Sequence, residues 1–220
     1  VILMLFKYLS KKKEEKPETG GIKNIIFDVG QVLVDYDWET YLDSFGFEPV
    51  KRERIAKATF QSPVWDERDR GLYEEDVYLK QFQELDPEDA EDIEKVIRGT
   101  GGTIHKRPYA DTWVKYLKSK GYHVYILSNY SSYMLDHTKK ELTFRREMDG
   151  EVFSCYAKQL KPDAEIYQII LNKYQLKPEE CVFIDDRSEN CRGAQEQGIH
   201  TICFKDFKQV TADLEKLGVK

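Results

Sequence analysis

The sequence has few of the features that would mark a secreted, membrane-spanning or nucleic-acid-binding protein. Only four cysteines occur among 220 residues, and their spacing matches no metal site, so we expect reduced thiols in a cytoplasmic protein. They are Cys155, Cys181, Cys191 and Cys203. Lysine and arginine (34) are outnumbered by aspartate and glutamate (40), and the formal charge of −6 indicates neither a nucleic-acid nor an anionic-membrane partner. No apolar run approaches the roughly 20 residues that span a bilayer, and there is no internal repeat.

The first 21 residues differ from the rest in composition. An apolar stretch from Val1 to Leu9 is followed by the charged sequence KKKEEKPETGG. The stretch is too short for a membrane span and lacks the basic start and small-residue cleavage site of a signal peptide. We expect residues 1–21 to be a disordered or weakly helical leader; an anchor at a membrane surface is the less favoured alternative.

Three short apolar runs end in polar side chains, and each is followed by sequence of helical character. The runs are NIIFD at 24–28, VYILSN at 124–129 and VFIDD at 182–186. Apolar runs of this length predict buried strands. Strands that alternate with helices form a parallel sheet, so we predict a doubly wound α/β fold.

The carboxyl ends of parallel strands meet at one edge of the sheet, where open sheets bind ligands. We therefore expect Asp28, Ser128, Asn129, Asp185 and Asp186 to converge. Polar residues end many strands simply because loops are wet, so one such ending would say little. An acid, a hydroxyl with an amide, and a pair of acids at three endings favour a functional site.

Residues 36–106 lack the strand pattern. Apolar residues recur there at helical spacing, as in Ile93, Val96 and Ile97. We interpret this segment as a helical cap inserted into an α/β core of residues 22–35 and 107–220. A cap of this kind closes over a catalytic edge, excludes water and contacts the substrate.

Within the cap, the stretch WDERDRGLYEED is the best candidate to line a pocket. Trp65 could stack on a substrate ring, and Arg70 could bind an anionic group. The alternative is ordinary structure, because most aromatic residues pack in a core and most arginines are surface charges.

Four motifs occur in a characteristic order: FDVGQVLVD, the Ser-Asn pair after the second strand, LKPDAEIY with Lys161, and FIDDRSEN. Together they resemble the haloacid dehalogenase superfamily of phosphohydrolases over about residues 22 to 204. The closest likeness is to the subgroup with a helical cap, which includes sugar-phosphate phosphatases similar to bacterial glucose-1-phosphatase.

The resemblance implies a role for each motif. Asp28 would be the nucleophile that forms an aspartyl-phosphate. Mg²⁺ would be held by Asp28, the backbone carbonyl of Gly30 and Asp186. The other roles are orientation of the metal by Asp185 and Asn190, phosphate binding by Ser128 and Asn129, and charge neutralisation by Lys161. Lysine is usually an exposed charge, but the position of Lys161 before Pro162 and a helix favours function.

One position departs from the common pattern of the superfamily. Most of its phosphatases have an aspartate two residues after the nucleophile, which protonates the leaving group, whereas this chain has Gly30. We expect a preference for good leaving groups, because general acid catalysis is typically worth about 10²- to 10⁴-fold. Asp35 or Asp37 could replace the acid, although an ordinary turn or helix-cap role is favoured for both.

The sequence thus predicts a Mg²⁺-dependent phosphatase acting on a small phosphorylated metabolite, for instance a sugar phosphate, as a monomer or homodimer. Two alternatives stay open. A 2-haloacid dehalogenase would use Asp28 to attack carbon without a metal, and a non-catalytic relative would only bind phosphorylated ligands.

Overall fold

A computed structural model describes residues 21–220. The predictions for residues 1–20 lie outside the described part. Five parallel strands form one sheet in the order β5-β4-β1-β6-β7. Their bounds are β1 Asn24–Phe27, β4 His123–Ser128, β5 Gly150–Phe153, β6 Cys181–Asp185 and β7 His200–Cys203. The fold class is confirmed, and β1 lies at the centre of the sheet, where Ile25, Ile26 and Phe27 are fully buried on its two faces.

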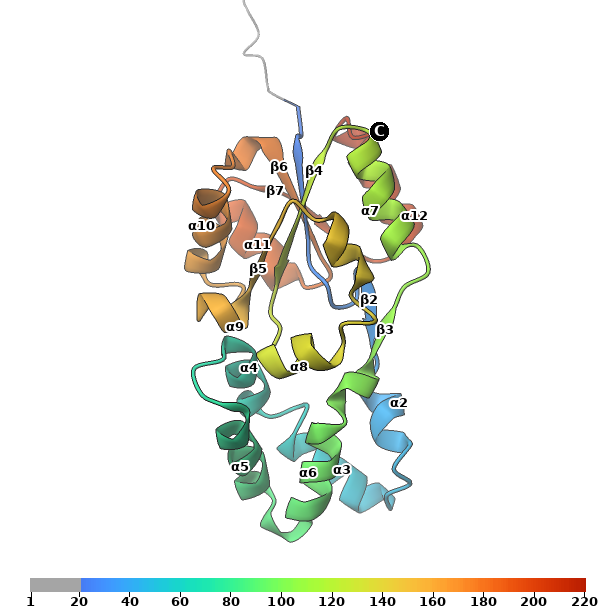
Figure 1. Ribbon diagram of the computed structural model, residues 1–220, viewed down its shortest axis with the longest axis vertical. Helices are drawn as coiled ribbons and strands as arrows, with labels where there is room; N and C mark the ends of the chain where they lie inside the picture. Colours follow the sequence, from blue (N-terminus) through green and yellow to red (C-terminus); the bar gives the residue numbers. More distant parts are fainter. Residues whose placement is uncertain (1–20) are drawn as a thin grey trace, which may run out of the picture.

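Helices cover both faces of this sheet. One face is covered by α7 (Ala110–Ser119) and α12 (Phe207–Lys216), and the other by α10 (Ala164–Lys173) and α11 (Ser188–Glu196) (Figure 1). The alternation along β1 explains the two layers. Ile25 packs in the first core cluster and Ile26 in the second, since successive side chains of a strand point to opposite faces.

The connection after β4 is more varied than the sequence predicts. We expected one polar, helical connection over residues 131–147. The structure has two short helices in this range, α8 (Ser132–His137) and η3 (Thr143–Glu147), as predicted. The edge strand β5 and the short helix α9 (Ser154–Ala157) follow the range and were not predicted. Four residues at a sheet edge, with Glu151 among them, give no alternating pattern that could reveal a strand. A further short helix, η4 (Pro178–Glu180), precedes β6.

The inserted cap is helical, as predicted. Its elements are α2 Trp38–Asp43, α3 Pro49–Ala58, α4 Pro63–Arg70, α5 Glu75–Leu85, η1 Pro87–Asp89, α6 Ala90–Arg98 and η2 Thr100–Thr103. They share a core in which Ile93, Val96 and Ile97 are fully buried. Val77, which fits the helical spacing, is instead 40% exposed.

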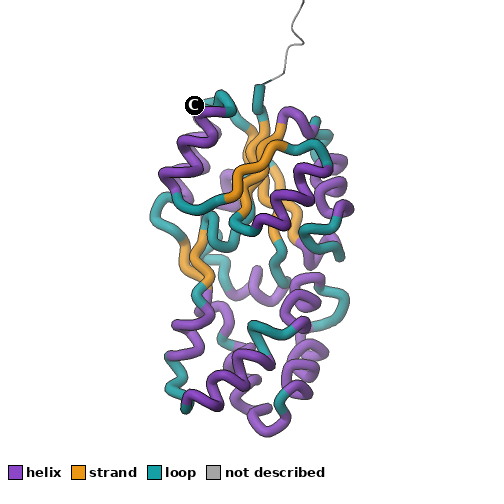
Figure 2. Tube along the Cα trace, turned by 180° about the vertical axis from the view of Figure 1, so that it is seen from behind, coloured by secondary structure: helices purple, strands orange, loops and turns teal. Residues whose placement is uncertain are grey.

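Two antiparallel strands, β2 (Val34–Tyr36) and β3 (Ile104–Lys106), join the cap to the sheet. Figure 2 shows this two-stranded connection between the helices of the cap and the parallel sheet. The cap boundaries that we propose, 36 and 106, fall at its ends. Across residues 21–220, no helix is both long and apolar enough to cross a membrane.

Candidate active site

Three aspartates meet at the carboxyl edge of the sheet. Asp28 directly follows β1, Asp185 ends β6 and Asp186 comes next. One carboxylate oxygen from each of the three lies within 4.8 Å of the other two. Because β1 and β6 are adjacent parallel strands, their ends lie side by side. The predicted convergence of these acids is therefore present in the structure.

A buried lysine joins two of the acids. The Nζ atom of Lys161 lies 2.8 Å from Asp28 Oδ1 and donates to Asp185 Oδ2 at 2.6 Å. Ser128, at the end of β4, donates its hydroxyl to Asp28 Oδ1 at 2.6 Å. Lys161 is 4% exposed, so it is not an ordinary surface charge. A buried cation between two acids can neutralise charge that builds up on either one.

Burial shifts the ionisation of this group. It raises the pKa of Asp28 to about 7, because desolvation of the carboxylate outweighs the opposing effects of Lys161 and Ser128. The pKa of Lys161 is also raised: burial disfavours its charged form, but Asp185 and Asp28 together favour that form more strongly. A divalent cation beside Asp28 would favour the ionised carboxylate.

The two acids after β6 have different surroundings. Asp185 is fully buried and accepts hydrogen bonds from the Arg187 backbone N–H and from Asn190 Nδ2 as well as from Lys161. Asp186 is partly exposed and lines the cavity described below. Asp185 is therefore held by the protein, while Asp186 can meet a ligand.

The donor set fits a hard cation such as Mg²⁺, which prefers oxygen ligands. Asp28, Gly30 and Asp186 all line the cavity, and they offer two carboxylates and a carbonyl. Nearby, the buried Oδ1 atom of Asn190 has no hydrogen-bond partner among the described residues. A buried unpaired oxygen is costly, and it could accept a hydrogen bond from a metal-bound water.

The Asn129 side chain makes more hydrogen bonds within the protein than we expected. Its Nδ2 donates to the Lys161 carbonyl at 3.1 Å, and its Oδ1 accepts from the Lys161 backbone N–H at 2.9 Å. This pair of bonds fixes the loop that presents Lys161. Asn129 still lines the cavity, but only its second N–H is left for a phosphate.

A cavity of about 320 Å³ lies over these residues, between the sheet edge and the cap. Its sheet side is polar, whereas the cap side is largely aromatic and includes Tyr36, Phe60 and Trp65. The Trp65 ring lies 5.0 Å from the Phe60 ring and 6.1 Å from the Tyr36 ring, centroid to centroid. Trp65 thus occupies the position that the sequence suggests, in a wall of three rings.

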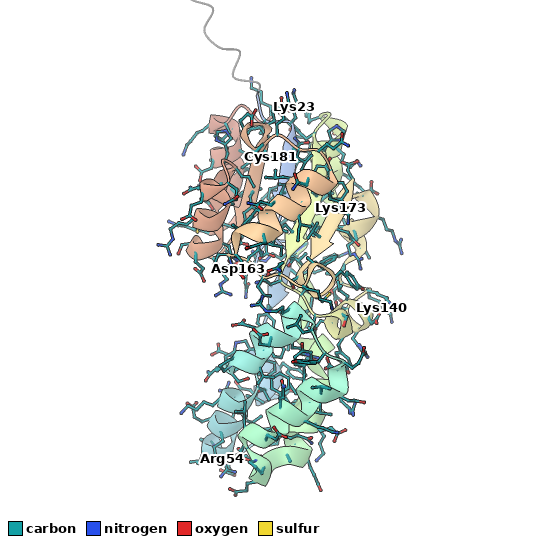
Figure 3. All side chains as sticks on the ribbon, turned by 90° about the vertical axis from the view of Figure 1, so that its left-hand side faces the viewer. Lys23, Arg54, Lys140, Asp163, Lys173 and Cys181 are labelled. Atoms are coloured by element: carbon teal, nitrogen blue, oxygen red, sulfur yellow. The ribbon has the colours of Figure 1, made fainter. Side chains whose placement is uncertain are left out.

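Arg70, in contrast, does not line the cavity. Its Nε lies 3.3 Å from a carboxylate oxygen of Glu67, and its Nη1 lies 3.9 Å from Asp163 Oδ2. Asp163 stands at the junction between sheet and cap, far from Arg54 at the tip of the cap (Figure 3). Arg70 therefore pairs with acids outside the cavity, and the site we propose no longer includes it.

The two acids considered as substitutes for the missing aspartate are both engaged elsewhere. Asp37 Oδ1 accepts from the Thr40 N–H at 3.0 Å and caps α2. Asp35 pairs with Arg107 at 2.9 Å and is about half exposed. In the turn after Asp28, the left-handed backbone position is Gln31, with φ of 56°.

Asp69 is an acid of the site that the sequence pattern did not single out. It lies near the end of α4 and lines the cavity together with Asp28 and Asp66. Burial raises the pKa of Asp69 to about 7, against opposing effects of Arg68 and the Ser131 backbone N–H. The stretch WDERDRG was expected to line a pocket, but its sequence does not indicate which face of the helix turns toward the cavity.

A parallel sheet with three clustered aspartates and a buried lysine, covered by a helical insertion, defines the class of cap-bearing α/β hydrolases. The family model for haloacid dehalogenase-like hydrolases matches residues 22–198, and the chain belongs to that family. The resemblance inferred from the four motifs is thus confirmed, and the protein is an enzyme of the hydrolase class.

Individual proteins show similar relationships. The chain is 25% identical to flavin mononucleotide hydrolase 1 of Arabidopsis thaliana, with 89% of this chain and 77% of that protein covered. It is 26% identical to the sesquiterpene phosphatase astK of Aspergillus oryzae, with 89% and 96% covered. A family enzyme of Bacteroides thetaiotaomicron, bt-2542, solved with magnesium and inorganic phosphate, has a TM-score of 0.68 at 23% identity, with 86% and 99% covered. The last match shows a shared fold.

Proposed function

We propose that this protein is a Mg²⁺-dependent phosphatase that acts on a small phosphorylated metabolite through an aspartyl-phosphate. The observation that carries this proposal is the position of Asp28. Its carboxylate is held by Ser128 and Lys161 and faces a cavity that Asp186 also lines. A carboxylate can attack phosphorus only if negative charge is neutralised around it, and this site supplies buried positive charge and a cluster of metal-ligand oxygens.

Asp28, Asp186 and the Gly30 carbonyl would hold the ion, with Asp185 and Asn190 orienting them. When bound, Mg²⁺ supplies positive charge that lets the phosphate approach the carboxylate. The structure of bt-2542 with magnesium and phosphate supports this proposal by likeness of fold. Lys161 lies close enough to Asp28 to neutralise charge on the nucleophile, and Ser128 holds that carboxylate in one orientation.

The cap side of the cavity supports a substrate with one phosphate and a ring or another apolar surface. Aromatic rings wall this side, and its charged groups are the acids Asp66 and Asp69. Among residues 21–220, the two cationic side chains that line the cavity, Lys161 and Arg187, lie on the sheet side. A second phosphate or a carboxylate under the cap would therefore be repelled. The names of the Arabidopsis and Aspergillus relatives agree with a ring or apolar group, and a sugar phosphate stays within this class.

A panel of phosphate esters assayed with and without Mg²⁺, alongside Asp28→Asn, tests the proposal. We expect phosphate release that depends on Mg²⁺, and covalent labelling at position 28 in the wild type alone. Beryllofluoride should mimic the aspartyl-phosphate. Phosphate release by Asp28→Asn at the wild-type rate would contradict the proposal.

A 2-haloacid dehalogenase is the second candidate, and Gly30 is the observation that favours it. Activity on a haloacid that survives EDTA would support that alternative, whereas loss of activity with EDTA would argue against it. A protein that only binds phosphorylated ligands would show saturable binding without labelling of Asp28. We propose a cytoplasmic location, with which the four free thiols agree, and a monomeric or homodimeric state.

A further inference from the structure

A phosphatase of this kind needs a proton donor that the residues around Gly30 do not supply. Departure of an alcohol from phosphate leaves an alkoxide unless an acid protonates its oxygen. Asp35 and Asp37 are bound elsewhere. Four carboxylates line the cavity among the described residues: Asp28, Asp66, Asp69 and Asp186. Asp28 and Asp186 belong to the nucleophile and metal positions, so the candidates for an acid are the two cap residues.

Asp69 is the better placed of the two. Asp66 is exposed, whereas Asp69 is only partly accessible and lies close enough to the Ser131 backbone N–H for that group to stabilise its charge. Ser131 lies three residues after Ser128, in the loop that would hold the phosphate. The Asp69 carboxyl therefore belongs to the cap, lies beside the loop after β4 and lines the same cavity as the nucleophile.

The backbone of Asp69 is fixed to the sheet side of the molecule. Its carbonyl accepts from Ser154 Oγ at 2.6 Å, and the same Oγ accepts from the Tyr130 backbone N–H at 2.9 Å. Gly71, two residues after Asp69, is also closely packed, because a Cβ there would meet Cys155 at 3.0 Å. In Figure 1 the end of α4 lies beside α9. These contacts connect Asp69 to the loop after β4 and keep it at the site.

We propose that Asp69 is the general acid and base of this enzyme, supplied by the cap in place of the aspartate missing at position 30. This inference rests on the proposed phosphatase function. It predicts that the leaving group departs toward the cap, in line with attack by Asp28 from the sheet side.

The proton transfers balance over one cycle. In the first step, an Asp28 oxygen bonds to phosphorus, the bond from phosphorus to the alcohol oxygen breaks, and the Asp69 carboxylic acid gives its proton to that oxygen. In the second step, the Asp69 carboxylate takes a proton from water as the water oxygen bonds to phosphorus. The bond from phosphorus to Asp28 then breaks, which leaves inorganic phosphate and restores the Asp69 acid.

The surroundings of Asp69 suit a group that exchanges a proton near neutral pH. Burial contributes most to its raised pKa, and Asp66 and Asp28 add to the effect, while Arg68 opposes it. The other ionisable groups near it are Tyr36, Tyr130 and Cys155. Tyrosine and cysteine are neutral near pH 7 at their ordinary pKa values, and burial raises the pKa of all three further. A carboxyl group with a pKa of about 7 can act in both directions.

The test compares Asp69→Asn with the matched control Asp66→Asn. The rates of phosphoenzyme formation and hydrolysis are measured by rapid quench with two substrates, para-nitrophenyl phosphate and an alkyl phosphate. For Asp69→Asn we expect formation from the alkyl phosphate to fall by about 10²- to 10⁴-fold, with a much smaller loss for the nitrophenyl ester. Phosphoenzyme hydrolysis should slow equally for both substrates. In Asp66→Asn, the ratio of the two substrates should stay as in the wild type.

A rescue variant separates proton transfer from a structural effect. A Cβ at Gly30 meets no atom within 4 Å, so a side chain can start there without a clash at its first atom. We expect Asp69→Asn/Gly30→Asp to recover the alkyl phosphate rate by at least about 10-fold over Asp69→Asn. The pH limb of the formation rate, which falls as Asp69 ionises, should be absent in Asp69→Asn.

Two outcomes would overturn different claims. Phosphoenzyme formation in the wild type with an unchanged substrate ratio in Asp69→Asn would refute the role of Asp69 and leave the phosphatase intact. A wild-type enzyme that forms no phosphoenzyme from any ester would instead refute the proposed function itself.

Discussion

The Nζ atom of Lys161 lies between two carboxylates, 2.8 Å from Asp28 Oδ1 and 2.6 Å from Asp185 Oδ2. The three groups are almost completely buried. The two contacts of Lys161 join the ends of β1 and β6 to the loop before α10. They therefore determine both the charge and the geometry of the site.

Replacement of this lysine should destabilise the fold as well as abolish activity. Lys161→Met leaves two buried carboxylates without a cation, and removal of one partner from a buried ion pair typically costs about 3–5 kcal/mol. Urea unfolding in EDTA measures the change. Lys140→Met, at an exposed position, serves as the control and should shift stability by less than about 0.5 kcal/mol. Equal stability of the two variants would show that the pair contributes little.

Asn190 should control metal affinity without binding the metal itself. Its Nδ2 donates to both Asp185 oxygens, at 3.0 and 3.1 Å, and its Oδ1 has no hydrogen-bond partner within residues 21–220. If the proposed function holds, Asn190→Leu should raise the Mg²⁺ concentration for half-maximal activity by about 10- to 100-fold, as expected when an orienting partner of a metal ligand is lost. Mg²⁺ titration checks this, with the exposed Asn172→Leu as control. An unchanged midpoint would exclude this role.

Close packing of α11 should be needed to position the lysine loop. A Cβ at Gly193 would lie 2.6 Å from the Pro162 carbonyl oxygen, a backbone atom that cannot rotate away. We expect Gly193→Ala to cost about 1–3 kcal/mol and to lower activity by displacing Lys161. Gly30→Ala meets no neighbour and is the matched control for stability. Thermal unfolding of both variants decides the matter, and equal melting temperatures would argue against a steric effect.

Stability should depend on pH through Asp69. Its pKa is about 7 in the folded protein and 3.8 without burial, so the folded state binds more protons between these values. The contribution of Asp69 to the stability of the fold is therefore fully present below about pH 4, and it is lost as the pH rises through about 7. Asp69→Asn lacks this loss, so its stability relative to the wild type should increase with pH. The gain is at most about 4 kcal/mol, and less because the cavity admits water.

Urea unfolding at about pH 4.5 and about pH 8, in EDTA, measures this difference. Glu196→Gln, at an exposed position, should follow the wild type at both pH values, whereas Asp66 cannot serve as the control because its charge adds to the raised pKa of Asp69. If the stability of Asp69→Asn relative to the wild type is the same at both, Asp69 is ionised throughout and the prediction is wrong.

The sequence was sufficient for the parts of the fold that depend on local pattern. Apolar runs of four to six residues revealed β1, β4 and β6, and helical periodicity revealed the inserted cap. Strands such as β5, β2 and β3 were not predicted, because three or four residues at a sheet edge are too few to show a period. Their pairing is set by neighbours that are distant in the chain.

The sequence by itself determined that Asp28, Ser128 and the Asp185–Asp186 pair would meet, because parallel strands place their carboxyl ends on one edge. Lys161 follows no strand, and only the resemblance of its motif to the family placed it at this site. It also showed that the acid expected at position 30 is missing. Only the tertiary structure decided which cap residues face the site. In the structure, Trp65 and Asp69 line the cavity, whereas Arg70 pairs with Asp163. The face that a cap helix presents depends on how the cap packs against the sheet, and residues far apart in the chain make those contacts.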